Sequence, residues 1–158
     1  MTETPIRIVA AGTARDAYLP LVFLADDSES EVRRYYQTGD LYALDDEARR
    51  PIAMILAIPD SDGSVELKAV AVDPSRQGQG IGRRLLAGVL ADLKARGVER
   101  VVVGTGNAGI GPLALYQKLG FRLWKIERDY FGPARGYPEG LEENGIPLRD
   151  MVWMDLDL

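Results

Sequence analysis

The chain has 158 residues, of which 46% are hydrophobic and 27% are charged, and its formal net charge is −5. This balance is that of a folded protein, and we expect a single domain over residues 1–158. Cysteine and histidine are both absent. Their absence excludes disulfides, thiolate nucleophiles, Ser-His-Asp triads and most zinc sites, and we predict no metal.

Charge and hydropathy also limit the partners. The sequence has no basic stripe for nucleic acid, and no apolar run approaches the ~20 residues of a membrane helix. The first five residues, Met-Thr-Glu-Thr-Pro, lack the basic and apolar parts of a signal segment. We therefore expect a cytoplasmic protein that binds neither nucleic acid nor membrane.

The first half of the chain predicts a strand, two helices and three more strands. The strands are expected at residues 6–9, 41–44, 52–58 and 65–72, with polar turns at 45–47 and 60–63. Thr13 and Asp16 form a capping pair for a helix to Ala25, which Pro20 interrupts or kinks. Ser28 and Glu31 form a capping box for a second helix, which we expect to end at Gly39.

The second half alternates between helices and strands. Apolar residues at helical spacing predict a helix from Ile81 to a cap at Gly97, and Pro112 suits the first turn of a later helix. Strands are expected at 101–103, 121–130 and 151–156, with a Gly/Pro-rich connection at 131–149. Hairpins followed by alternating helices and strands favour a mixed sheet with helices on both faces. The last strand is apolar enough either to pair across a homodimer or to lie in the core.

A glycine-rich turn joins the strand at 65–72 to the helix that begins near Ile81. Three glycines within residues 78–82 leave backbone N–H groups open to a phosphate. The helix then begins with Arg83 and Arg84 and has no carboxylate in its first turn, which conflicts with the positive end of the helix dipole. A bound anion removes this conflict, so the turn predicts a phosphorylated cofactor.

The same turn is not a P-loop and not a dinucleotide fingerprint. No Lys-Ser/Thr follows the glycines, and Arg83 stands where the third glycine of the fingerprint belongs. Instead, Gln77, Gly80 and Gly82 match the pattern Gln/Arg-x-x-Gly-x-Gly/Ala. With the preceding Val-Asp-Pro, this resembles the acetyl-coenzyme A loop of the GNAT superfamily of N-acetyltransferases.

A second segment, residues 113–121, carries the Tyr-x-x-x-Gly-Phe ending of a GNAT helix that packs beside the cofactor. The resemblance implies a mixed α/β (α+β) fold, with a mostly antiparallel sheet of about seven strands between helices. Residues 143–146 and 149–151, together with the turn at 104–107, further resemble a YvbK-like bacterial subgroup of this superfamily.

The resemblance implies two candidate catalytic residues. Tyr116 matches the tyrosine that often faces the coenzyme A sulfur, where a neutral phenol could protonate the departing thiolate. The alternative for Tyr116 is packing at a helix–sheet contact, with its hydroxyl bonded to backbone. Glu66 is the candidate base for the amine, on the same strand face as Lys68. The alternative for Glu66 is a solvated charge opposite Lys68.

The implied cofactor contacts come from the strand end, the turn and two later residues. The backbone groups of Val70 and Val72 would bond the pantetheine arm, and Tyr116 would lie at its sulfur. Arg83 and Arg84 are candidate phosphate partners or ordinary solvated arginines. The full cofactor set is Val70, Val72, Arg76, Gln77, Gly78, Gln79, Gly80, Ile81, Gly82, Arg83, Asn107 and Tyr116. Asn107 enters because Gly109 stands where many relatives have an asparagine, and Asn107 is the nearest one.

Residues 104–109 present a competing G-x-G-x-x-G motif after a strand and before a helix. Only 49 residues follow Gly109, too few for a second nucleotide-binding half. We therefore interpret these glycines as the floor of the cofactor cleft, with NAD binding as the alternative.

The predicted function is transfer of an acetyl group from acetyl-coenzyme A to a primary amine. Without cysteine, we favour direct attack in a ternary complex, and an acidic chain suits a cationic, small-molecule amine. The alternatives are a protein lysine or N-terminus as acceptor, and a GNAT-fold module that binds acyl-coenzyme A without turnover. We expect the acceptor site to contain Tyr18, Phe23, Tyr35, Tyr36 and the segment 137–150, with Glu139, Glu142 and Glu143 attracting the amine.

Overall fold

A seven-stranded sheet in the order β1-β2-β3-β4-β5-β9-β6 runs through the computed structural model, which describes residues 5–158. Its strands are β1 (Arg7–Val9), β2 (Asp40–Asp45), β3 (Pro51–Pro59), β4 (Val65–Val72), β5 (Arg100–Gly106), β6 (Arg122–Glu127) and β9 (Met151–Asp157). Only β4 and β5 pair in parallel, and every other pair of neighbours is antiparallel. The mostly antiparallel mixed sheet predicted from the sequence is therefore confirmed.

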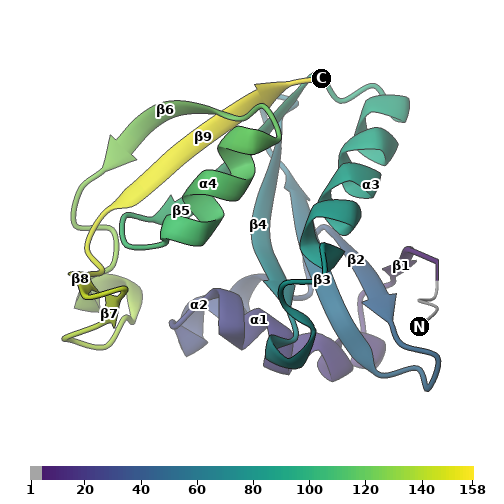
Figure 1. The fold of residues 1–158 in the computed structure, drawn as a ribbon, viewed down its shortest axis with the longest axis horizontal. Helices are drawn as coiled ribbons and strands as arrows, with labels where there is room; N and C mark the ends of the chain where they lie inside the picture. The colour runs from purple at the N-terminus through teal and green to yellow at the C-terminus, as the bar shows by residue number, and fades with distance from the viewer. Residues whose placement is uncertain (1–4) are drawn as a thin grey trace.

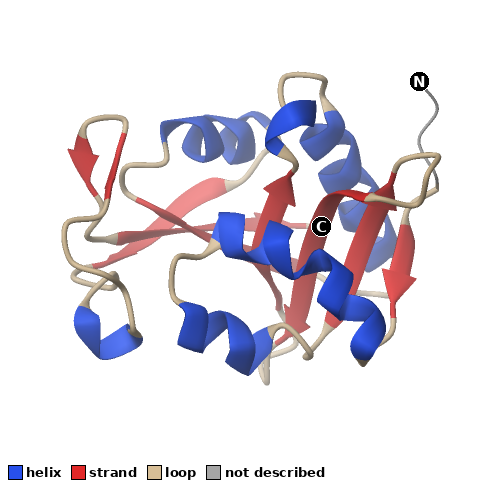
Figure 2. Cartoon of the chain, turned by 90° about the horizontal axis from the view of Figure 1, so that it is seen from below, coloured by secondary structure: helices blue, strands red, loops and turns tan. Residues whose placement is uncertain are grey.

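Helices cover both faces of the sheet (Figures 1 and 2). They are α1 (Leu19–Ala25), α2 (Glu29–Tyr35), α3 (Ile81–Ala95) and α4 (Ile110–Lys118), and a small hairpin is formed by β7 (Glu142–Glu143) and β8 (Ile146–Pro147). One core lies between the sheet and α3 with α4, and a second lies between the sheet and α1 with α2. None of the helices in the part of the chain described here has the length and apolarity to cross a membrane.

Strand β4 contains a bulge at Lys68. Leu56 of β3 pairs with Ala69, but the next β3 residue, Ala57, pairs with Leu67, so Lys68 is the extra residue. The bulge changes which face each side chain occupies. Leu67 packs into the core under α3 and α4, whereas Ala69 packs into the core under α1 and α2.

Strands β4 and β5 separate after three residue pairs. Val65–Leu67 pair with Val101–Val103, after which β5 continues alongside β9 and β4 continues alongside β3. Within residues 5–158, no strand pairs with the β5-facing edge of β4 beyond Leu67. Figure 1 shows β5, β9 and α4 diverging from β4.

The first helical segment differs from the prediction. Residues Thr13–Tyr18 form a 3₁₀ helix with no side-chain cap, and the Asp16 carboxylate instead accepts a hydrogen bond from the Tyr36 hydroxyl at 2.9 Å. Pro20 lies in the first turn of α1, so it begins that helix and does not kink it. The Ser28 cap is confirmed, because its hydroxyl accepts from the Glu31 N–H at 3.3 Å, although α2 ends at Tyr35, before Gly39.

The last strand lies inside the sheet. Strand β9 pairs with β5 on one side and β6 on the other, so the prediction that it pairs across a dimer is wrong and its core alternative is confirmed. The edge strands are β1 and β6, and β6 carries the exposed side chains of Leu123, Trp124 and Ile126. A homodimer stays a prediction.

Arg15 fixes the chain around α1 and α2. Its guanidinium is buried and donates to the backbone carbonyls of Val9, Tyr36, Thr38 and Gly39, at 2.7–3.1 Å. We expect Arg15→Met to lower the free energy of unfolding by about 3 kcal/mol, because four buried or partly buried hydrogen bonds to backbone carbonyls are lost. Chemical denaturation measures this loss.

The matched control is Arg33→Met, because Arg33 is exposed and bonds only the exposed Glu29 within its own helix. Its free energy of unfolding should change by about 0.5 kcal/mol or less. Equal losses in the two variants would contradict the role of Arg15.

Candidate active site

The turn between β4 and α3 has the backbone of an anion site. Gly78 and Gly80 both adopt positive φ, 79° and 76°, and no atom lies within 4 Å of where their Cβ would stand. Helix α3 has no side-chain cap at its N-terminus and no acidic residue in its first turn. Its first N–H groups are therefore open, as the sequence predicted, to an anion that approaches this end of the helix.

The side chains of the turn differ in their contacts: two bond or pair with neighbouring segments, and the others are exposed. Gln77 Nε2 donates to the Val72 carbonyl at 3.2 Å, which ties the turn to the end of β4. Arg76 lies with Nη2 3.7 Å from the Asp46 carboxylate in the β2–β3 turn. Arg83 and Gln79 are exposed to solvent. The backbone is thus the better-defined part of this site.

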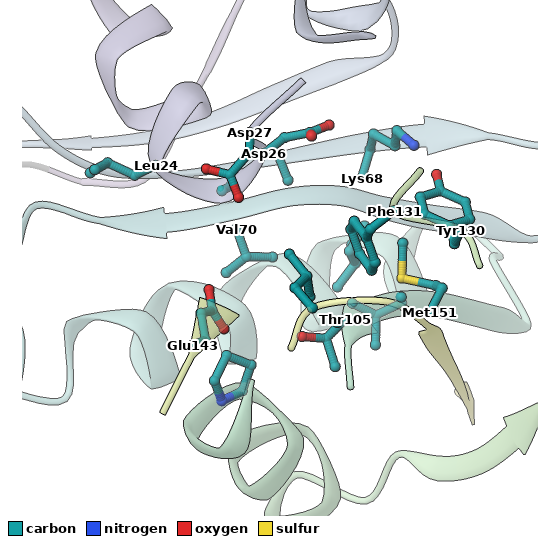
Figure 3. A pocket seen from close by; sticks show the side chains of 18 of the residues that line it. Leu24, Asp26, Asp27, Lys68, Val70, Thr105, Tyr130, Phe131, Glu143 and Met151 are labelled. Carbon is teal, nitrogen blue, oxygen red and sulfur yellow. The ribbon is translucent and has the colours of Figure 1, made fainter. Parts of the chain in front are cut away.

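A cavity of about 200 Å³ opens where β4 and β5 separate (Figure 3). Its floor is formed by residues 66–70 of β4 and 103–106 of β5, and its walls by the end of α1, the side of α4 and the connection after β6. Glu66, Val70 and Tyr116, three of the predicted site residues, all line it. Val72 lies just outside it, at the glycine turn.

Tyr116 reaches this cavity from α4. The residue is 5% exposed, and its ring makes an edge-to-face contact with Phe121 at 5.6 Å between centroids. Burial raises the pKa of the phenol above its ordinary value, so the hydroxyl keeps its proton at neutral pH. Among the hydrogen bonds of residues 5–158, none involves this hydroxyl, so it is not bonded to backbone as the packing alternative predicted. It is free to bond a molecule in the cavity.

Glu66 and Lys68 lie on the same side of β4, as predicted. The Glu66 carboxylate is 3.8 Å from the Lys68 ammonium, which also lies 5.1 Å from the centre of the Tyr35 ring. Burial raises the pKa of Glu66, and the nearby Lys68 charge opposes that rise. Glu66 is therefore a carboxylate of increased basicity at the edge of the cavity.

Hydrogen bonds to the Asp26 carboxylate, which we call the latch, join the chain segments on one side of the cavity. Asp26, at the end of α1, accepts hydrogen bonds from the hydroxyls of Tyr35 at 2.8 Å and Tyr137 at 2.7 Å, and from the Ser28 N–H at 3.1 Å. The Ser28 hydroxyl in turn donates to the Arg135 carbonyl at 2.7 Å. These bonds join the α1–α2 junction to the connection between β6 and β9.

The predicted acceptor residues fall into two groups. Tyr18 donates to Asp45, Tyr36 donates to Asp16, and neither they nor Phe23 line the cavity. From the segment 137–150, Tyr137, Glu143 and Leu148 do line it, whereas Glu139 and Glu142 do not.

Sequence reasoning missed Asp26, Asp27, Tyr130 and Phe131, which also line the cavity. The available signals were the acidic pair directly after an apolar helix and the aromatic pair that opens the Gly/Pro-rich connection.

Asn107 is bonded to the chain before β9. Its side-chain oxygen accepts from the N–H groups of Arg149 and Asp150, and its amide donates to the Pro147 carbonyl, at 2.9–3.0 Å. It does not line the cavity. Asn107 thus holds the chain before β9 in place, and its contact with the cofactor stays a prediction.

The competing glycine motif is not a phosphate turn. Gly104 and Gly106 lie within β5, where an added Cβ would stand 2.8 Å from Met151 Sδ and 2.3 Å from Leu148 Cδ1 respectively. These glycines make room for side chains that pack over β5. Because both line the cavity, the interpretation of this segment as the cleft floor fits the structure.

Comparison with known proteins agrees with this geometry. Residues 13–121 match the model of the acetyltransferase (GNAT) family. The "Uncharacterized N-acetyltransferase YvbK" of Bacillus subtilis is 36% identical over 160 residues, covering all of both chains. The chain belongs to the GNAT family of acetyltransferases.

Two solved structures are similar over nearly the whole chain. An "IAA acetyltransferase" from Bacillus cereus superposes with a TM-score of 0.88 at 34% identity, covering 99% of this chain and 100% of that one. A GNAT family acetyltransferase from Elizabethkingia anophelis, solved with acetyl-CoA bound, gives a TM-score of 0.88 at 35% identity, covering 99% and 98%.

The charge balance at Glu66 can be tested directly. Side-chain NMR titration should place the pKa of Glu66 above the ordinary glutamate value, because burial disfavours its charged form. In Lys68→Met this pKa should rise further, because the opposing positive charge is gone. Since the folded-state pKa is raised, Glu66 contributes stability below the unfolded-state pKa that is lost as the pH rises through the folded-state pKa. A Glu66 pKa that falls in Lys68→Met would contradict this account.

Proposed function

We propose that this protein transfers the acetyl group of acetyl-coenzyme A to a primary amine by direct attack in a ternary complex. One observation carries the proposal: a neutral, unpartnered tyrosine hydroxyl and a carboxylate of raised pKa line one cavity beside the free edge of β4. The acetyl-CoA bound to the similar Elizabethkingia anophelis protein supports the choice of cofactor.

Each part of the cofactor would meet a matching part of the chain. The diphosphate would bind the open N–H groups between Gly78 and Gly82 at the start of α3. The pantetheine arm would follow the unpaired edge of β4 past Val72 and Val70, using backbone groups. The thioester would then lie in the cavity, within reach of Tyr116.

The chemical step removes two protons from the nitrogen of the ammonium and supplies one to the sulfur. Glu66 would take a proton from the ammonium, directly or through water, leaving a neutral amine. The amine nitrogen would attack the acetyl carbon, and collapse of the tetrahedral intermediate would break the carbon–sulfur bond. The departing thiolate would receive the Tyr116 proton, and the attacking nitrogen would lose its second proton, which returns to the Tyr116 oxygen. The cavity measures about 200 Å³, which is less than the roughly 300–1,000 Å³ of typical small-molecule sites. We therefore favour a small-molecule amine over a larger acceptor.

The role of Tyr116 predicts a loss of rate without a loss of cofactor affinity. Tyr116→Phe removes only the proton donor, so kcat should fall about 10²-fold, while calorimetry should give an unchanged Kd for acetyl-coenzyme A. Thiol release, read with a chromogenic disulfide, measures the rate.

The matched control is Tyr36→Phe, whose hydroxyl bonds Asp16 away from the cavity. Its kcat should stay within about twofold. If Tyr116→Phe keeps the full rate, Tyr116 is not the acid. Binding without turnover on any amine would favour a module that binds acyl-coenzyme A.

The glycine turn predicts where cofactor affinity resides. Gly80→Asp places a carboxylate at the proposed phosphate site, and we expect affinity for acetyl-coenzyme A to fall at least about tenfold. Gly97→Asp is the matched control, because Gly97 also has positive φ, 87°, and open space, but follows the other end of α3.

Calorimetry on both variants, with NAD titrated alongside, separates lost phosphate binding from backbone strain. Equal losses in the two variants, or binding of NAD in preference to acetyl-coenzyme A, would overturn the assignment of this turn.

A further inference from the structure

The cavity holds more negative charge than one amine requires. Four carboxylates line it, those of Asp26, Asp27, Glu66 and Glu143, whereas Lys68 is the single lysine or arginine among the lining residues. Asp26 is committed to the hydroxyls of Tyr35 and Tyr137, and Glu66 faces Lys68. Two carboxylates remain to be explained.

The side-chain carboxylates of Asp27 and Glu143, two solvent-exposed residues, have no hydrogen-bond or ion-pair partner within residues 5–158. Both line the cavity, and Figure 3 shows them on opposite walls, Asp27 at the end of α1 and Glu143 on β7. Burial and the neighbouring Asp26 charge both raise the pKa of Asp27, so a nearby cation would favour its charged form. A cation between these walls would have this effect.

The chain is held in place beside each of the two carboxylates. The latch at Asp26 fixes the residue next to Asp27, through Tyr35, Tyr137 and the Ser28 N–H. Glu143 precedes Asn144, whose amide donates to the Ala108 carbonyl at 2.9 Å. The site for a cation is therefore organised before a ligand arrives.

The buried Tyr116 hydroxyl is a second observation that indicates a ligand site in this cavity. Tyr116 is only 5% exposed and lines the same cavity. Its hydroxyl lacks a hydrogen-bond partner among the described residues. The rings of Tyr130 and Phe131 form part of the wall. The Arg135 guanidinium lies 4.0 Å from the centre of the Tyr130 ring, so Phe131 is the ring that can contact the methylene groups of a ligand. Acid, aromatic and carboxylate groups thus surround one small volume.

We propose that the acceptor is a small molecule with two amino groups. One amine attacks the thioester beside Glu66 and Tyr116, while the second stays protonated between Asp27 and Glu143. This inference rests on the proposed function and specifies its substrate. The second ammonium compensates the two carboxylates, which a monoamine of the same length leaves without a positive partner.

A matched set of amines tests the proposal. Linear α,ω-diaminoalkanes of three to six carbons are compared with the monoamine and the ω-amino alcohol of each length, by thiol release with acetyl-coenzyme A. We expect kcat/KM for the best diamine to exceed that of its monoamine at least about tenfold, since hydrogen bonds to a charged group have about this effect. The amino alcohol should behave as the monoamine.

Variants locate the effect on the two walls. Asp27→Asn and Glu143→Gln should each reduce the diamine-to-monoamine ratio of kcat/KM about tenfold. Glu142→Gln removes the same charge one residue away, but Glu142 does not line the cavity, so its ratio should stay within about twofold. Calorimetry with acetyl-coenzyme A and thermal unfolding confirm that each variant is folded.

Several outcomes would overturn the proposal while leaving acetyl transfer intact. These are equal use of monoamines and diamines, faster turnover of a peptide with a single N-terminal amine, or an equal effect of Glu142→Gln and Glu143→Gln. Failure of the proposed function is different, because then no amine of any kind would release coenzyme A.

Discussion

The separation of β4 from β5 after Leu67 is the constraint on which the rest of the site depends. Three residue pairs hold the two halves of the sheet together, and beyond them each strand follows a different neighbour. A parallel edge left unpaired exposes backbone groups that a ligand can bond as a strand would. Every group proposed to contact the cofactor or the amine lies along this opening.

The bulge at Lys68 changes the face of the sheet on which the side chains of β4 lie. Without it, Glu66 and Val70 would share a face, because they are four residues apart in a strand of period two. With the extra residue, Val70 packs toward the core under α3 and α4, and Lys68 lies against Tyr35 of α2. The cofactor can therefore approach from the side of α3, while the carboxylate stands on the side of α1 and α2.

Local patterns in the sequence predicted the parts of the site that depend on few residues. The bounds of β4 and the start of α3 follow from alternation and from a glycine turn, and Tyr116 follows from a short motif. The latch at Asp26 could not be predicted this way, because Tyr137 lies 111 residues further along the chain. The same holds for the insertion of β9 between β5 and β6, which depends on sheet pairing and not on local pattern. The bonds of Asn107 to the chain before β9, and the side chains that Gly104 and Gly106 accommodate, likewise depend on residues distant in the sequence.

Opposite charges at the two ends of the opening explain why an acidic chain can bind an anionic cofactor. The cofactor end offers open N–H groups at the start of α3 and the exposed Arg83, and carboxylates line the other end. Glu66 stands between them, where burial alone would favour its neutral form and reduce the fraction able to accept a proton. Lys68 counteracts this by favouring the carboxylate. Its position at the bulge therefore matters chemically, because it limits how far the enclosed cavity can raise the pKa of Glu66.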